Sequence, residues 1–108
     1  MKKLLIALFA SVLVFTGCGG HGQYYKECRP EVQEIAADAC EALQMHIDGK
    51  MEDDEAERKL ELMYEELDEM DDLNMYEDNV KMYVQFAGGD VALGETGIDQ
   101  LHNLEDYL

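Results

Sequence analysis

Apolar residues recur through residues 30–48 at the 3.6-residue period of an α-helix, and this pattern limits the possible folds most. On a helical projection seven residues fall within an arc of about 100°: Val32, Ile35, Ala36, Ala39, Leu43, His46 and Ile47. Pro30 suits the first helical turn, where its missing N–H is not needed. Gly49 suits the left-handed position after a helix end. The pattern predicts an amphipathic helix from Pro30 to Asp48.

A second helix is predicted from Asp53 to Asp72, with Asp53 capping its first turn. Its apolar residues follow the 4-3-4-3 spacing of a heptad seam: Ala56, Leu60, Met63, Leu67 and Met70. The seam lasts only about two heptads, which favours a helix packed in an antiparallel bundle over an extended coiled coil.

A third helix is expected to begin after Asn74, which forms a capping-box pair with Glu77. Its apolar stripe consists of Tyr76, Val80, Tyr83, Val84 and Ala87. Gly88 and Gly89 are expected to end it. Thr96 is then expected to cap a short last helix whose buried side holds Ile98, Leu101, Leu104 or Glu105, and Leu108. No useful strand-like alternation occurs, so the predicted fold is all-α: a small three-helix bundle with a short C-terminal fourth helix.

The first seventeen residues have the order of a secretory signal peptide. Lys2 and Lys3 form a positive head, residues 4–15 are an apolar stretch, and the small residues Thr16 and Gly17 follow. A helix that spans a membrane needs about 20 apolar residues, so this stretch is too short to be one. We therefore expect residues 1–17 to direct export.

The segment Phe15-Thr16-Gly17-Cys18 resembles the lipobox of bacterial lipoproteins, which prefers Leu at the position of Phe15. The resemblance covers residues 1–18 only. It implies cleavage before Cys18 and a diacylglycerol on the sulfur of Cys18. Because two or more acyl chains anchor a protein stably, we expect a domain outside the cytoplasm that is lipid-anchored to the cell membrane or outer membrane.

Cleavage before Cys18 divides the rest of the chain into a tether and a domain. Residues 18–29 are expected to form the lipidated cysteine and a flexible tether, because residues 19–23 are rich in glycine. Residues 30–108 form the expected acidic helical domain. Loss of Lys2 and Lys3 leaves 6 basic residues against 25 acidic ones, a net charge of −19. Such a surface repels nucleic acid and anionic lipid headgroups and attracts cations or basic proteins.

Cys28 and Cys40 are the two thiols that remain once Cys18 is acylated. An even pair in a small exported domain suggests a disulfide. If the first helix begins at Pro30, Cys40 lies about 15 Å along its axis and the bond cannot close. If the helix begins near Gln33, the bond can close and would add about 3 kcal/mol. Two unpaired thiols are the alternative.

Residues 48–55 resemble the second half of a calcium-binding EF-hand loop, with acidic ligand candidates Asp48, Glu52 and Glu55 around Gly49. The first half is missing, since Gln44 and His46 stand where two carboxylates should be. Such a site would bind Ca²⁺ weakly or not at all. The alternative is a helix-ending glycine, a Met51 that packs under the turn, and the acidic start of the next helix.

Residues 52–78 carry fourteen acidic residues and only two basic ones, Arg58 and Lys59. They form either a face for a basic partner or a solvated surface that keeps the protein soluble. No catalytic triad order, phosphate loop or nucleotide fingerprint is present, and no helical His or Cys pair predicts a transition-metal site. We therefore expect no enzymatic activity and no cofactor. The expected function is a protein-interaction module at the cell envelope for a basic envelope or exported protein, with weak calcium binding as the alternative.

Overall fold

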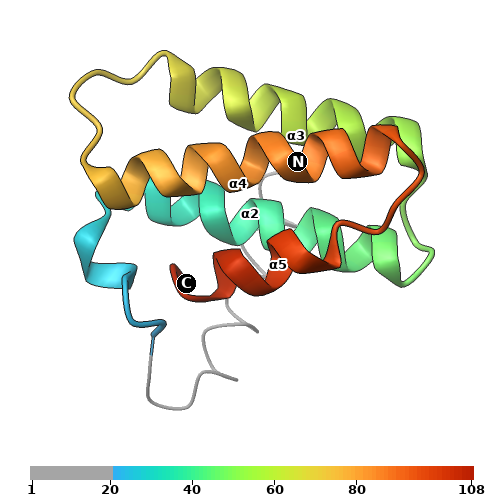
Figure 1. Ribbon diagram of the computed structural model, residues 1–108, viewed down its shortest axis with the longest axis horizontal. Helices are drawn as coiled ribbons and strands as arrows, with labels where there is room; N and C mark the ends of the chain where they lie inside the picture. The colour runs from blue at the N-terminus through green and yellow to red at the C-terminus, as the bar shows by residue number, and fades with distance from the viewer. Residues whose placement is uncertain (1–20) are drawn as a thin grey trace, which may run out of the picture.

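The computed structural model describes residues 21–108, so the signal segment and Cys18 lie outside the described residues. A short 3₁₀ turn, η1 (Tyr25–Glu27), precedes four helices: α2 (Pro30–Ile47), α3 (Asp53–Asp68), α4 (Met75–Ala92) and α5 (Ile98–Glu105). Residues 21–108 contain no strand, and the predicted all-α fold is confirmed. The helices α2 and α4 contact each other and both remaining helices, and α3 and α5 lie on opposite sides of this pair (Figure 1).

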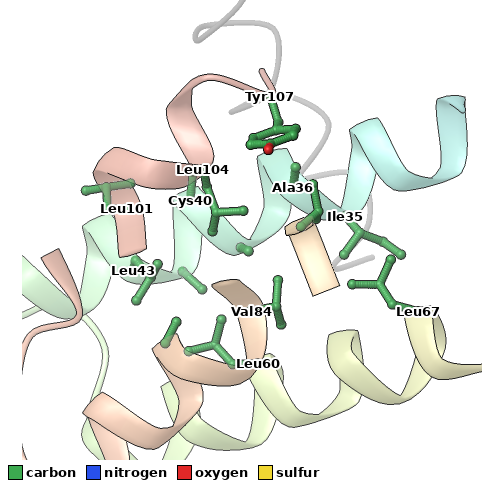
Figure 2. Packing of buried hydrophobic residues seen from close by; sticks show 14 of the residues in the cluster. Ile35, Ala36, Cys40, Leu43, Leu60, Leu67, Val84, Leu101, Leu104 and Tyr107 are labelled. Atoms are coloured by element: carbon green, nitrogen blue, oxygen red, sulfur yellow. The ribbon is translucent and has the colours of Figure 1, made fainter. Parts of the chain in front are cut away.

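The apolar stripes predicted from the sequence converge on one core (Figure 2). Val32, Leu60 and Val84 are fully buried and come from α2, α3 and α4 respectively. On α5 Leu101 and Leu104 are buried, while Glu105 is exposed. Within residues 21–108 the buried core residues lie between Cys28 and Tyr107.

The two ends of α2 lie close to their predicted positions. Pro30 is the first helical residue, and Gly49 follows the C-cap Asp48 with a φ of 76°. The amide of Gly49 donates to the carbonyl of His46, and the amide of Lys50 donates to that of Met45. These two bonds form a Schellman motif, which satisfies carbonyls that a helix end leaves unpaired.

The second helix is shorter than predicted, since α3 ends at Asp68 rather than Asp72. Its N-cap is Glu52, whereas Asp53 is already helical and does not cap. The chain leaves the helix after Glu69, and Asp72 adopts a φ of 60° that turns it toward α4. The end of α3 could not be predicted from the apolar spacing, because Met70 lies in the loop and still packs against the core.

The expectation that Gly88 and Gly89 end the third helix is wrong, because α4 continues to Ala92. Each glycine weakens a helix by about 1 kcal/mol relative to alanine. Ala87 and Val91, on either side of the glycine pair, are both buried in the core. Continued helix is what buries Val91, and this burial offsets the glycine penalty. Gly94, with a φ of 84°, then ends the helix.

The cap of α5 is displaced by one residue from the prediction. Gly97 occupies the N-cap position with a φ of 73°, and the hydroxyl of Thr96 accepts a bond from the amide of Ile98. A β-carbon at Gly97 would lie 2.9 Å from Leu43, so α2 and this turn approach closely. Glycine is therefore required here by both its conformation and the space available.

Residues 22–28, expected to belong to the tether, are bonded to the C-terminal end of the helical domain. The amide of Gly22 donates to the carbonyl of Leu108, and that of Tyr24 donates to Asp106. The ring of Tyr24 lies 5.1 Å from that of Tyr76 and 5.3 Å from that of Tyr107, between ring centroids. The N-terminal segment, residues 22–28, thus lies against the C-terminus of the chain.

Two glycine substitutions test whether the N-terminal segment is docked. One lies in the docked segment and the other lies in a helix, where alanine is favoured over glycine. A β-carbon at Gly22 would lie 2.4 Å from the Asp106 backbone, whereas one at Gly89 meets nothing within 4 Å. In a chain produced from Gly19 onward, Gly22→Ala should lower the free energy of unfolding by about 1–2 kcal/mol through two weakened hydrogen bonds. Gly89→Ala should raise it by about 0.5–1 kcal/mol. Urea unfolding followed by circular dichroism measures both, and equal effects would contradict a docked N-terminal segment.

Candidate functional site

The most extensively hydrogen-bonded group of side chains in the described chain surrounds Glu77, in the first turn of α4. Its carboxylate is buried, with 2 % of the residue exposed. One oxygen accepts bonds from the amide and the Nε of Arg29, at 2.8 and 2.9 Å. The other accepts from the Nη2 of Arg29 and the amide of Asn74, at 3.1 and 3.0 Å. Four donors therefore satisfy a carboxylate that can accept about four bonds.

The same group connects the start of α2 with the loop between α3 and α4. The guanidinium of Arg29 also donates to the carbonyls of Asp71 and Asp72. Asn74 caps α4 through the amide of Glu77 and donates its side-chain N–H to the carbonyl of Glu27. We call this set of residues (Glu27, Arg29, Asp71, Asp72, Asn74 and Glu77) the Glu77 junction. Its bonds close a span of 48 residues along the sequence.

Sequence reasoning found only part of this junction. The capping box between Asn74 and Glu77 is confirmed. The sequence pattern did not reveal the burial of Glu77 or its pairing with Arg29. A charged residue between the apolar Tyr76 and Val80 was the available signal, because such a residue lies near the buried face of the helix.

Two carboxyl groups of the domain have pKa values displaced in opposite directions. Burial alone would raise the pKa of Glu77, but the hydrogen bonds from Arg29 and Asn74 outweigh it and hold the pKa below its ordinary value. Burial and the neighbouring Asp38 raise the pKa of Glu41, although Lys59 partly counteracts them. One oxygen of Glu41 is buried without a hydrogen-bond partner. The junction therefore stabilises its charge, whereas the site of Glu41 penalises one.

Cys28 and Cys40 are both buried and both free thiols in the structure. Burial, with the charges of Glu77 and Glu27 adding to it, raises the pKa of Cys28 to about 11. Burial raises the pKa of Cys40 to about 12. α2 begins at Pro30, which is the first of the two starting points considered for this helix. From there Cys40 lies about 15 Å along the helix axis, too far for a disulfide with Cys28 to close. The two side chains act in this structure as small apolar core residues of low nucleophilicity.

The turn at residues 48–55 follows the structural alternative to an EF-hand. Gly49 ends α2, Met51 is buried, and the acidic residues Asp53, Asp54 and Glu55 form the first turn of α3. Across residues 21–108 no group of three or more His, Cys, Asp or Glu side chains is placed to hold a metal ion. The candidate ligands Asp48, Glu52 and Glu55 are thus not brought together.

His46 joins the end of α2 to the start of α3. Its Nε2 lies 2.5 Å from a carboxylate oxygen of Asp53, and its side chain is 8 % exposed. The Nδ1 atom is buried and has no hydrogen-bond partner. The histidine thus packs at the turn through one ring nitrogen, in keeping with its place on the edge of the apolar stripe.

The acidic surface is concentrated on α3 and the loop that follows it. Of the fourteen acidic residues between positions 52 and 78, only Glu77 is buried and the other thirteen are exposed. Asp68 pairs with Lys81 of α4 at 2.7 Å. Apart from Asp78 on α4, these exposed acidic residues lie on α3 and its flanking turns, and we call the exposed acidic residues of positions 52–72 the α3 acidic surface.

Comparison with known proteins gives no assignment. No family model matches the chain. Neither the curated proteins nor the solved structures contain a significant match to it. Within residues 21–108 no helix has the length and apolar character that crossing a membrane requires.

Substitution of Glu77 by glutamine tests the junction and its ionisation. Glutamine has the same shape as glutamate, but its N–H₂ group replaces one oxygen that accepts two hydrogen bonds. Two N–H donors would then face another donor, so Glu77→Gln should lower the free energy of unfolding at pH 7 by about 1–3 kcal/mol. The folded pKa of Glu77 is below the unfolded one, so its stabilisation is complete above the unfolded pKa of about 4.3 and is lost as pH falls through the folded pKa. The deficit of the variant should therefore shrink below about pH 4.

Glu41→Gln is the matched control, because the pKa of Glu41 is raised rather than lowered. The change in the free energy of unfolding at pH 7 should therefore have the opposite sign. The ionised form of Glu41 is penalised above the folded pKa, so the variant should be as stable as the wild type or more stable at pH 7. Any such gain should vanish below about pH 4.3, where both states bind the proton. Urea titrations from pH 3 to pH 7 measure both variants. A Glu77→Gln deficit that stays constant over this range would contradict the ionised junction.

Proposed function

We propose that the protein is an exported lipoprotein whose acidic helical domain binds a basic protein at the cell envelope and catalyses no reaction. The observation that carries the proposal is the net charge of −19 left after residues 1–17, with thirteen exposed acidic residues between positions 52 and 78. A surface of this sign attracts basic proteins over several ångströms and repels nucleic acid and anionic lipid.

The packing of α3 supports a binding role. The α3 acidic surface belongs to a helix whose opposite face, Ala56, Leu60 and Leu67, is fully buried. Its acidic residues are therefore gathered on one packed helix rather than spread along an extended tail. A concentrated charge of one sign speeds the encounter with a partner of the opposite charge. At 0.15 M salt the screening length is about 8 Å, so binding through this surface should weaken strongly as salt is added.

The proposed anchor restricts how the domain sits at the membrane. Cys18 would carry the lipid, and it lies only four positions before Gly22, which is bonded to Leu108. Four residues span at most about 14 Å. The end of the domain that holds the chain's C-terminus would therefore lie next to the bilayer. The calcium function has no comparable support, because Asp48, Glu52 and Glu55 do not converge.

Affinity capture from an envelope extract tests the proposal. The bait is the chain from Gly19 onward, compared with a variant that has five exposed acids of α3 and its C-cap changed to glutamine: Glu57, Glu61, Glu65, Glu66 and Glu69. A control variant loses the same charge elsewhere by amide substitution of Glu31, Glu34, Glu95, Asp99 and Asp106. Proteins of high isoelectric point should be retained at 50 mM salt and released by 0.5 M salt.

Retention should fall for the α3 variant and persist for the control variant, because the charge lost is equal and only its place differs. The measurement is quantitative mass spectrometry of the retained proteins. If no basic envelope protein is retained more strongly by the wild type than by the α3 variant, the proposed function is wrong.

A further inference from the structure

The outer face of α4 carries an aligned row of exposed apolar side chains. Met75, Met82, Phe86 and Leu93 are 67 %, 36 %, 48 % and 78 % exposed. Their spacing of 7, 4 and 7 residues places them within an arc of about 40° on a helix of 3.6 residues per turn. Leu93 is the C-cap residue and continues the line of the helix. We call these four residues the α4 apolar stripe.

This stripe is separate from the core. The inward face of the same helix is formed by Val80, Val84, Ala87 and Val91, which are all buried. In Figure 1 the helix α4 runs between α3 and α5, and among the described helices α2, α3 and α5 contact it. Single exposed apolar residues are ordinary on protein surfaces, but four in one line on one helix form a surface that another element can cover.

The stripe has the dimensions of a helix-binding surface. Met75 and Leu93 are eighteen residues apart, which corresponds to about 27 Å, or five turns, of helix. Gly89 lies on the same line, and a β-carbon there would meet nothing within 4 Å, so the backbone is open at this point. Methionine side chains adapt to varied partners, and an amphipathic helix binds such a surface through residues spaced three and four apart.

Charge decides which helix fits. The exposed Asp78 lies beside the stripe on α4, and Asp68 at the end of α3 reaches α4, where it pairs with Lys81. A second copy of this domain would bring a charge of −19 against a charge of −19. A helix with an apolar face and Lys or Arg beside it would instead cover the stripe, with a basic residue near Asp78, and would be attracted by the acidic charge of the domain.

We infer that the α4 apolar stripe is the docking surface for a basic amphipathic helix of another protein. The inference rests on the proposed function for the sign of the partner's charge, and adds to it the contact surface and the secondary structure of the partner. The acidic residues then provide attraction and orientation, whereas Met82 and Phe86 at the centre of the stripe provide the short-range contacts. Central, desolvated side chains dominate affinity in most interfaces.

Binding of designed peptides to the chain produced from Gly19 onward tests the inference. One 18-residue helical peptide carries leucine at heptad a and d positions and lysine elsewhere. A second has glutamate in place of lysine, and a third has the composition of the first with its leucines out of register. Fluorescence anisotropy at 0.15 M salt gives the dissociation constants, and backbone NMR shifts locate the contact.

The protein variants separate the stripe from general charge attraction. Met82→Gln with Phe86→Gln leaves every charge in place and should weaken binding of the first peptide tenfold or more. Leu62→Gln is the matched control, because Leu62 is 57 % exposed on the outer side of α3, and it should change binding less than twofold. The out-of-register peptide should bind at least tenfold more weakly, and the glutamate peptide should not bind.

Each remaining outcome overturns the inference in a distinguishable way. Equal binding to the wild type and the Met82/Phe86 variant would show attraction by charge alone, which overturns the stripe but leaves the proposed function intact. No binding of any lysine peptide would overturn both. A wild type that sediments as a dimer, and a Met82/Phe86 variant that sediments as a monomer, would show that a second copy covers the stripe.

Discussion

The buried carboxylate of Glu77 is the interaction on which the rest of this small domain depends. A buried charge is tolerated only where it is paired and hydrogen-bonded, and here Arg29 and Asn74 supply all four donors. Replacing such a pair by apolar groups is often neutral, but removing one partner is strongly destabilising. The junction therefore commits the chain to one arrangement in which residue 29 and residue 77 must meet.

That arrangement has consequences beyond the junction itself. Arg29 stands directly before α2 and directly after the N-terminal segment, so holding it in place also positions Tyr24 against Tyr76 and Tyr107. The N-terminal segment and the C-terminus then lie together. In the proposed orientation this end faces the bilayer, and the outer faces of α3 and α4 remain accessible to a partner. The charge of Glu77 is thus buried and paired, whereas the charges of the α3 acidic surface are solvated.

The existence of four helices could be predicted because burial follows the 3.6-residue period in each of them. Their ends were less predictable, since they depend on tertiary contacts. Gly88 and Gly89 do not end α4 because Val91 is buried beyond them, and α3 stops early because its loop turns toward Arg29. The docking of residues 22–28 was missed for the same reason, since this short segment shows no apolar period.

The candidate binding surfaces were predictable to different degrees. The acidic run between positions 52 and 78 is visible in composition alone, and its exposure follows from charge. The α4 apolar stripe was not recognised, because both faces of that helix are apolar and the sequence does not say which one is buried. The disulfide hypothesis depended on where the first helix begins, and Pro30 as its first residue favours two free thiols.

Hydrogen exchange of the Arg29 amide tests the central role of the junction most directly. This N–H donates to the buried carboxylate of Glu77 and lies at a helix start, where amides ordinarily exchange fast. At pH 7 we predict that it exchanges only with global unfolding, with the same opening free energy as the amide of the core residue Val84. Exchange within tenfold of the rate of an unfolded chain would contradict a Glu77 junction that holds the fold together.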